Sequence, residues 1–333
     1  MSTSRKKVVI ISVTGNSGEP IARGLVESGK FSITGTVRPL SLDKPIVKDF
    51  KALGITIVPI DWQTAPQADL EALFADADTV ISTCSFAAVS DQPRLADAAK
   101  AAGVKRFVPS EWASVCPPGV MLIEDTKRVV RDYIQKINLP YTIIQVGGWY
   151  QVEFPPLSAQ SWGNGKLYNV YGGGETATAS CDRRNMGRFV ARIIDDDETL
   201  GKYVLAHEEE VAQNRLWALA EKYAPGRLAG RRVDVSAEEL DRLIRKAEQS
   251  NDLGSLIWNQ YMKSSFVSGH NSVAAAKKDG WLIARELYPD VPVCTAEEYA
   301  KEIYSTSECL NTPAMITSQY SYISLYASAP SKL

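Results

Sequence analysis

A glycine-containing turn is the first segment whose residue types and spacing could do chemistry. Ser12–Gly18 reads SVTGNSG and lies between the first predicted strand, whose apolar run begins at Val8, and a helical pattern. Gly15 and Gly18 permit a tight turn, and the N-terminus of the following helix offers free N–H groups to an anion. In a strand–turn–helix context such a turn binds the pyrophosphate of a dinucleotide, although an ordinary connecting loop can share the pattern. The other turn residues expected at the cofactor are Thr14, Asn16 and Ser17.

Two cations near the end of the second predicted strand bear on cofactor choice. An acidic residue there binds the ribose of NAD, whereas an arginine suits the 2′-phosphate of NADP. Arg38 lies at the strand end in GTVRPLSLDKP, and Lys44 lies just beyond. Both can bind phosphate. The sequence therefore favours NADPH/NADP+, with Asp43 as a competing acidic residue and a pair of solvated loop cations as the alternative.

Lys127 lies on a predicted helix over residues 124–137, in phase with its apolar stripe. That stripe consists of Val130, Tyr133, Ile134 and Ile137. We predict that Lys127 points inward and that burial lowers its pKa, so that it exchanges a proton near neutral pH. The alternative is a lysine that reaches solvent from the helix edge. Candidate neighbours are Glu111 and Asp125.

Alternating apolar runs and helical patterns organise the first 150 residues. Strands are predicted at 8–13, 31–37, 55–60, 79–84, 106–110 and 141–147, and helices at 19–29, 43–53, 67–76, 90–102 and 124–137. This alternation predicts an α/β fold: a Rossmann-type, doubly wound parallel sheet with helices on both faces. We place an NADP-binding domain at 1–155 and a smaller substrate-binding lobe at 156–333, which returns in part to the sheet.

The second half is rich in aromatic residues. One cluster contains Trp149, Tyr150, Phe154, Trp162 and Tyr168, and another contains Trp258, Tyr261 and Phe266. Such side chains suit the wall of a pocket for a flat molecule, but each could equally belong to the core. Helices are predicted at 211–223 and 236–249, with capping boxes at Ser236/Glu239 and Thr295/Glu298. The segment from about residue 306 shows no period and is expected to wrap the surface; His270 is not assigned a role.

Composition excludes several classes of function. The chain has 333 residues, 45% of them hydrophobic and 23% charged, with a net charge of -2, so no basic surface for nucleic acid is expected. No long apolar run or secretory signal is present, which points to a cytoplasmic protein that does not bind membranes. The five cysteines form no CxxC pair and the two histidines no HExxH motif, which argues against a disulfide framework and a zinc site. The expected partner is a small-molecule substrate, and the expected assembly a monomer or homodimer.

Several separated motifs give the chain a family resemblance. They are TGNSG at 14–18, Arg38, DQPRLADAAKAAGVKRFVPSEW at 91–112, Lys127, LPYTII at 139–144 and ELYPDVPVCTAEEY at 286–299. With these motifs the chain resembles the NmrA-like, isoflavone-reductase-like branch of the atypical short-chain dehydrogenases, from about Val8 to Tyr304. The Tyr-x-x-x-Lys pair of common short-chain dehydrogenases is missing from the sequence.

The resemblance implies an NADPH-dependent reductase of an aromatic or conjugated, phenylpropanoid- or polyketide-like substrate. Lys127 matches the lysine that this branch uses as its acid–base residue. Further cofactor contacts are implied at Ser82, Ser110, Trp112, Lys127, Gly147 and Trp149. Substrate contacts are expected at Trp149, Tyr150 and Phe154.

Three departures from the family pattern leave other functions open. Ser12 replaces the first glycine of the turn, residues 109–113 read PSEWA in place of PSEFG, and residues 147–150 read GGWY. The last two departures lie where nicotinamide and substrate meet in the family. The alternatives are an NADP-sensing regulator without catalysis and a non-redox enzyme, for a cyclisation or dehydration, on the same fold.

Overall fold

A parallel sheet forms the centre of the molecule. The computed structural model describes residues 5–157 and 166–305, so Trp162 and the segment from residue 306 lie outside it. Five strands pair in the order β3-β2-β1-β4-β5, which is the predicted α/β arrangement. Their bounds are β1 (Lys6–Ile11), β2 (Phe31–Val37), β3 (Thr56–Pro59), β4 (Thr79–Ser82) and β5 (Arg106–Val108). A parallel bridge between Phe107 and Tyr141 leads from β5 towards a second parallel set, made of β6 (Ile143–Gln145), β10 (Tyr203–Leu205) and β13 (Leu282–Ile283).

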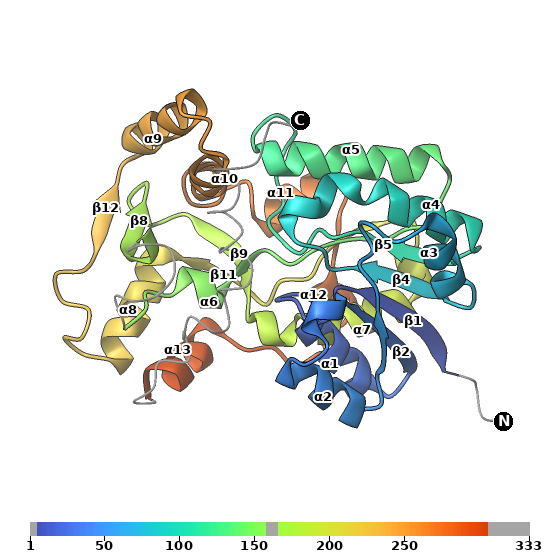
Figure 1. Cartoon of the computed structure of the whole chain (residues 1–333). Helices are drawn as coiled ribbons and strands as arrows, with labels where there is room; N and C mark the ends of the chain where they lie inside the picture. The colour runs from blue at the N-terminus through green and yellow to red at the C-terminus, as the bar shows by residue number, and fades with distance from the viewer. Residues whose placement is uncertain (1–4, 158–165, 306–333) are drawn as a thin grey trace.

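Both faces of β1 are buried, as its continuous apolar run predicts. Val8 and Ile10 pack into one core with α1 (Gly18–Ser28), α2 (Pro45–Ala52) and α7 (Met186–Asp195). Val9 and Ile11 pack into the other with α3 (Gln67–Phe74), α4 (Pro93–Ala101) and α5 (Leu122–Lys136). In Figure 1, α1 and α2 lie below the sheet, while α4 and α5 lie above it.

Helices α1 and α7 meet backbone to backbone. A Cβ added to Gly24 would lie 2.2 Å from the carbonyl carbon of Gly187, and one added to Gly187 would lie 2.0 Å from the carbonyl oxygen of Pro20. Any side chain at either glycine would therefore force the helices apart. This close approach holds a segment from the second half of the chain against the first helix of the sheet.

Most of the remaining elements form a lobe beside the carboxyl ends of the central strands, at the left of Figure 1. β9 (Ala177–Cys181) pairs in parallel with β7 (Gly148–Trp149) and antiparallel with β11 (Glu209–Ala212), and β12 (Val233–Val235) pairs with β8 (Asn169–Tyr171). The helices of this half are α6 (Tyr150–Glu153), α8 (Gln213–Tyr223), α9 (Ala237–Gln249), α10 (Leu253–Met262), α11 (Val273–Lys278), α12 (Ala284–Leu287) and α13 (Ala296–Ser305). A π-helical turn, Lys263–Val267, continues α10.

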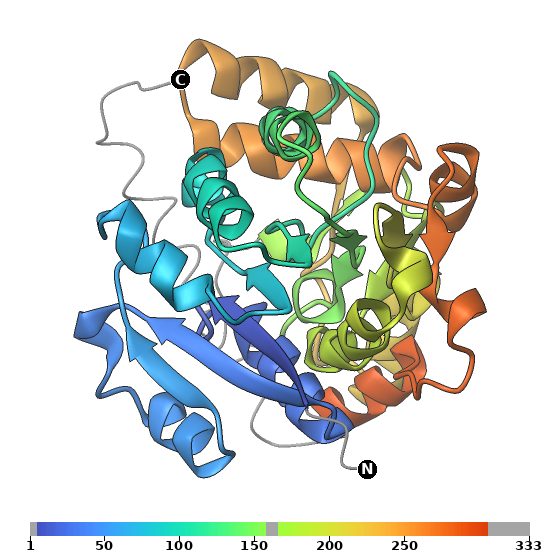
Figure 2. The same ribbon diagram turned by 90° about the vertical axis from the view of Figure 1, so that its right-hand side faces the viewer.

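Figure 2 shows α9 and α10 packed side by side and α10 close to α5. Of the two predicted capping boxes, Thr295/Glu298 is complete, whereas at Ser236/Glu239 the Glu239 carboxylate pairs with Arg242 and Ser236 caps the helix alone. The Ser236 hydroxyl accepts a hydrogen bond from the Glu239 amide, and Thr295 and Glu298 cap each other reciprocally. Within residues 5–157 and 166–305, no helix has the length and apolar character needed to cross a membrane, and no group of side chains has the make-up of a metal site.

Candidate active site

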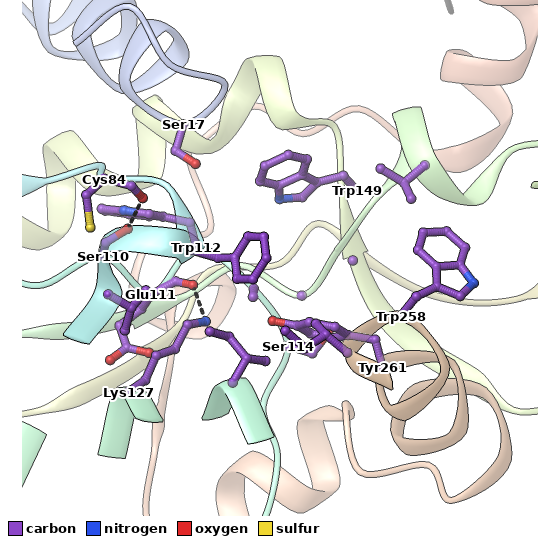
Figure 3. Close-up of a pocket in the computed structure, with 18 of the residues that line it drawn as sticks. Ser17, Cys84, Ser110, Glu111, Trp112, Ser114, Lys127, Trp149, Trp258 and Tyr261 are labelled. Carbon is purple, nitrogen blue, oxygen red and sulfur yellow. Dashed lines mark hydrogen bonds between the residues drawn. The ribbon is translucent and has the colours of Figure 1, made fainter. Parts of the chain in front are cut away.

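A pocket lies at the carboxyl ends of the parallel strands. Its wall includes Ser17 after β1, Cys84 after β4, the segment 110–114 after β5 and the segment 147–149 after β6. Helix α10 closes the opposite side with Trp258 and Tyr261, and α5 contributes Lys127 (Figure 3). The cavity holds about 190 Å³. Ligands of open α/β sheets bind at this edge, so the pocket is the candidate active site.

The predicted phosphate turn has the form that an anion needs. No hydrogen bond is present from the backbone amides of Asn16, Ser17 or Gly18 to any group in the described part of the chain. A Cβ on Gly18 would lie 2.7 Å from the Val13 carbonyl oxygen, so only glycine fits there. Three free N–H groups at the start of an 11-residue helix form a ready anion site.

Ser12 explains one departure from the family pattern. Its φ angle is 64°, in the left-handed region that glycine adopts most readily. The Thr36 hydroxyl accepts a hydrogen bond from the Ser12 amide, and the Thr83 hydroxyl donates one to the Ser12 carbonyl. Ser12 therefore adopts a backbone conformation that glycine adopts without a steric penalty, at a cost in conformational strain.

Arg183 supports the same turn and was not predicted. Its Nη1 donates to the carbonyl oxygen of Asn16 at 2.8 Å and to the Asn16 side-chain oxygen at 3.1 Å. Its guanidinium carbon lies 6.0 Å from the ring centre of Trp149. Because 167 residues separate Arg183 from Asn16, no local sequence pattern could have revealed this contact.

Lys127 is buried, as its position in the helix predicts. Its Nζ donates to the Glu111 carbonyl oxygen and to Glu124 Oε1, both at 2.7 Å. These two bonds account for two of its three ammonium hydrogens, and the side chain forms part of the pocket wall. Asp125, a predicted neighbour, instead accepts a hydrogen bond from the Gly119 amide.

The predicted direction of the Lys127 pKa shift is wrong. Burial alone would lower the pKa, but the negative charges of Glu124 and Glu111, the nearby Tyr261 and the hydrogen bond to Glu124 raise it above the usual lysine value. The ammonium is therefore held in its charged form at neutral pH. That state suits the donation of a proton or the stabilisation of negative charge, and does not suit a resting general base.

A buried ionic network holds Lys127 in place. Arg131 binds both carboxylate oxygens of Glu111 and lies 2.9 Å from Glu124 Oε2. Gln145 donates to both carboxylates at 3.2 Å. Two cations and two anions thus neutralise one another in a site where every one of their side chains is at most 5% exposed.

Other predicted cofactor residues line or support the pocket. Ser110, Trp112, Gly147 and Trp149 form part of its wall. The Trp112 indole N–H donates to the Ser82 carbonyl oxygen at 2.9 Å, so Ser82 lies behind the wall. At Gly147 φ is 77°, and a Cβ there would lie 2.2 Å from a neighbouring backbone oxygen.

Four of the predicted site residues lie elsewhere. Arg38 and Lys44 are exposed beyond β2 and do not line the pocket. Tyr150 and Phe154 are fully buried in an aromatic core with Tyr299, which corrects their placement at the substrate.

The helical period explains this correction. Residues 150 and 154 are one turn apart on the core side of α6, while residues 149, 152 and 153 lie on its pocket side. Within the predicted clusters, Trp149, Trp258 and Tyr261 do line the pocket.

Glu153 is a pocket residue that sequence reasoning missed. Burial raises its pKa to about 8, a shift that the nearby Ser180 hydroxyl opposes only in part. Its position one turn after Trp149 on α6 is the sequence signal that could have indicated it.

The chain is similar in sequence to a known family and to several characterised proteins. A model of the NmrA-like family matches residues 4–300. Asnovolin J 5′,6′-dehydrogenase from Aspergillus novofumigatus is 33% identical, over 90% of this chain and 96% of that protein. Phenylcoumaran benzylic ether reductase Pyrc5 from Pyrus communis is 27% identical, over 90% of this chain and 99% of that protein.

Solved structures share the fold. Leucoanthocyanidin reductase of Vitis vinifera with NADPH has a TM-score of 0.73 at 22% identity, over 90% of this chain and all of that one. AtPrR2 with NADP+ and (+)pinoresinol has the same TM-score and identity, over 90% and 99% of the two chains. The motifs from the phosphate turn to Lys127, and a match that runs nearly end to end, show that this chain belongs to the NmrA-like family.

Proposed function

We propose that the chain is an NADPH-dependent reductase of an aromatic or conjugated small molecule, and that Lys127 supplies the proton. The observation that carries this proposal is the continuous wall from Ser17, at the start of α1, to Lys127 on α5. An anion-binding turn and a charged, buried proton donor thus border one cavity.

The residues of the site fit a dinucleotide. The free amides of residues 16–18 would hold the pyrophosphate, and Arg38 beyond β2 would bind the 2′-phosphate of NADPH. Trp112 and Gly147 shape the wall where the nicotinamide would lie. When bound, the cofactor supplies a hydride, and the protein supplies position and charge.

Lys127 is suited to protonating the reduced substrate. Glu124 and the Glu111 carbonyl fix two of its ammonium hydrogens, which leaves the third for the pocket. The positive charge stabilises negative charge that develops on a substrate oxygen or carbon, and the N–H then delivers the proton. Glu124 and Arg131 hold the ammonium in place without touching the substrate themselves.

The pocket wall favours a flat, largely apolar substrate. Phe86, Trp149, Trp258 and Tyr261 supply aromatic surface, and Ile123 and Ile257 add aliphatic surface. This composition agrees with relatives named for reductions of phenylpropanoid-type molecules. One relative is named a dehydrogenase, which moves hydride in the opposite direction. A resting ammonium at Lys127 favours reduction, because the group is poised to give a proton.

Turnover of NADPH by two Lys127 variants tests the proposal. NADPH absorbance is followed with a panel of isoflavones, lignans and polyketide-like enones. Lys127→Met removes the proton and the charge but keeps the side-chain length, and should reduce turnover about 10²–10⁴-fold with little change in NADPH affinity. Lys127→Arg should fail similarly, because arginine cannot release its proton.

Lys136 is an exposed lysine on the same helix. Its variant Lys136→Ala is the control and should retain full turnover. A protein that binds NADPH but turns over nothing would be a regulator. Substrate conversion without NADPH oxidation would identify a non-redox enzyme. Full activity of Lys127→Met would contradict the proton-donor role.

A further inference from the structure

Glu153 occupies a position between two cavities. It lines the main pocket together with Lys127, and it also lines a smaller cavity with Lys166 and Tyr171. Val152 and Trp258 border both spaces as well. A substrate that fills the main pocket and extends beyond it would therefore pass the Glu153 carboxyl group.

The backbone makes room for this carboxyl group. A Cβ added to Gly148 would lie 1.8 Å from Glu153 Oε1, so the carboxyl occupies the space that a side chain at residue 148 would fill. Gly148 belongs to the GGWY segment, in which the chain departs from the family pattern. The glycine and the glutamate thus form one structural unit around Trp149, an expected cofactor contact: Gly148 immediately precedes Trp149, and Glu153 follows it by four residues.

One carboxyl oxygen of Glu153 has no partner. Oε2 is buried and has no hydrogen-bond partner among the described residues. A buried, unpaired polar atom is costly, and a buried unpaired charge is more so, which favours the neutral acid. The neutral acid carries an O–H that can donate a hydrogen bond.

The surroundings of Glu153 supply little positive charge that would lower its pKa. The titratable groups near it are Tyr150 on α6, Cys181 on β9, Lys166 and Tyr171 at the smaller cavity, and Lys127, Glu111 and Tyr261 at the main pocket. Burial is the main cause of its pKa shift, with only the Ser180 hydroxyl opposing it. The charge of Lys127 is already balanced by Glu124.

We propose that Glu153 is a second substrate-binding group, whose protonated carboxyl donates a hydrogen bond to a carbonyl or hydroxyl oxygen of the substrate. The proposal rests on the proposed reductase function, and it narrows the substrate class. The molecule carries an uncharged oxygen acceptor apart from the atom that Lys127 protonates. As the pH rises above neutral, Glu153 itself ionises and would repel a substrate carboxylate at this point, so such a substrate would be disfavoured.

Infrared difference spectroscopy tests the protonation state directly. The spectrum of the wild type minus that of Glu153→Gln should show the C=O band of a protonated carboxyl at pH 6.5, and this band should be half lost near pH 8. Glu239→Gln, which removes an exposed glutamate, should show no such band at pH 6.5. Gly148→Ala should shift the frequency of the band, because its Cβ displaces the carboxyl group from its present surroundings.

The donor role is tested with chalcone, an aryl enone, added to the NADP+-bound protein so that no reduction occurs. The Glu153 band should shift to lower frequency as its O–H bonds to the ketone oxygen. A missing band at pH 6.5, or a band that chalcone leaves unshifted, would overturn the proposal. NADP+ affinity is measured by calorimetry on the same samples. Loss of NADP+ binding would instead refute the proposed function, since the band at pH 6.5 does not depend on the cofactor.

Discussion

Glu124→Gln tests the buried ionic network that holds Lys127. The substitution keeps the shape of the side chain but removes its charge. Glu124 Oε1 lies 2.7 Å from Lys127 Nζ, and at that separation two unit charges attract by about 6 kcal/mol at an effective dielectric constant of about 20. Desolvation of both groups offsets part of this attraction, and removal of one partner of a buried ion pair typically costs about 3–5 kcal/mol. We expect a loss of unfolding free energy in that range.

Urea unfolding at pH 7, followed by circular dichroism, measures the effect. Glu239→Gln is the matched control, because Glu239 pairs with Arg242 at the same i,i+3 spacing but both side chains are exposed. The control should change stability little. Glu124→Gln should also bring the alkaline loss of turnover to lower pH, because Glu124 is the strongest influence raising the pKa of Lys127. A stability loss below about 1 kcal/mol, or one equal to the control, would refute the network's role.

Three further predictions concern the cofactor, the turn and pH. Arg38→Ala should weaken NADPH binding about 10- to 100-fold, the equivalent of one charge-assisted contact, and leave NADH binding unchanged in calorimetry; equal losses for both cofactors would contradict the assignment. Ser12→Gly should raise the unfolding free energy in urea by about 1 kcal/mol, because φ is positive there, and a decrease would show that no strain is stored. Between about pH 6.5 and 8 the wild type should lose about 1–2 kcal/mol of stability. Most of the loss arises because burial makes the pKa of Glu153 higher in the folded than in the unfolded chain, and Glu208, whose pKa burial raises to about 7, adds to it. Glu153→Gln should therefore reduce this slope in urea unfolding at several pH values.

Local patterns predicted the sheet well, because the hydrophobic pattern of each strand or helix lies within a short stretch of the sequence. The alternation of Val8, Val9, Ile10 and Ile11 between two cores follows from a continuous apolar strand, and the bounds of β2 match the prediction. Helix α7 is not among the predicted elements, since Gly187 in its first turn is a poor helix former. That glycine matters for packing against α1, which is a contact between distant parts of the chain.

A site residue was placed correctly when the phase of its own helix determines where it lies. The helical phase placed Lys127 inside, but its pKa depends on charges brought to it by folding, so the sequence could not fix the sign of the shift. Glu124 lies three residues before Lys127, a spacing at which two side chains of a helix can pair. Asp125 was predicted as the neighbour instead, and it accepts a hydrogen bond from the Gly119 amide. Aromatic type alone did not distinguish Trp149 from Tyr150. Trp149 precedes α6 and faces the pocket, whereas Tyr150 is the first residue of α6 and faces the core.

Transfer of deuterium from NADPH to product tests the central claim most directly. NADPH carrying deuterium at both C4 positions of the dihydronicotinamide is incubated with the protein and the substrate found in the panel, and the product is analysed by mass spectrometry. The account predicts one deuterium in the product for each NADPH oxidised, and loss of both signals in Lys127→Met while NADPH still binds. A product that forms without deuterium, or at the same rate without NADPH, would contradict it.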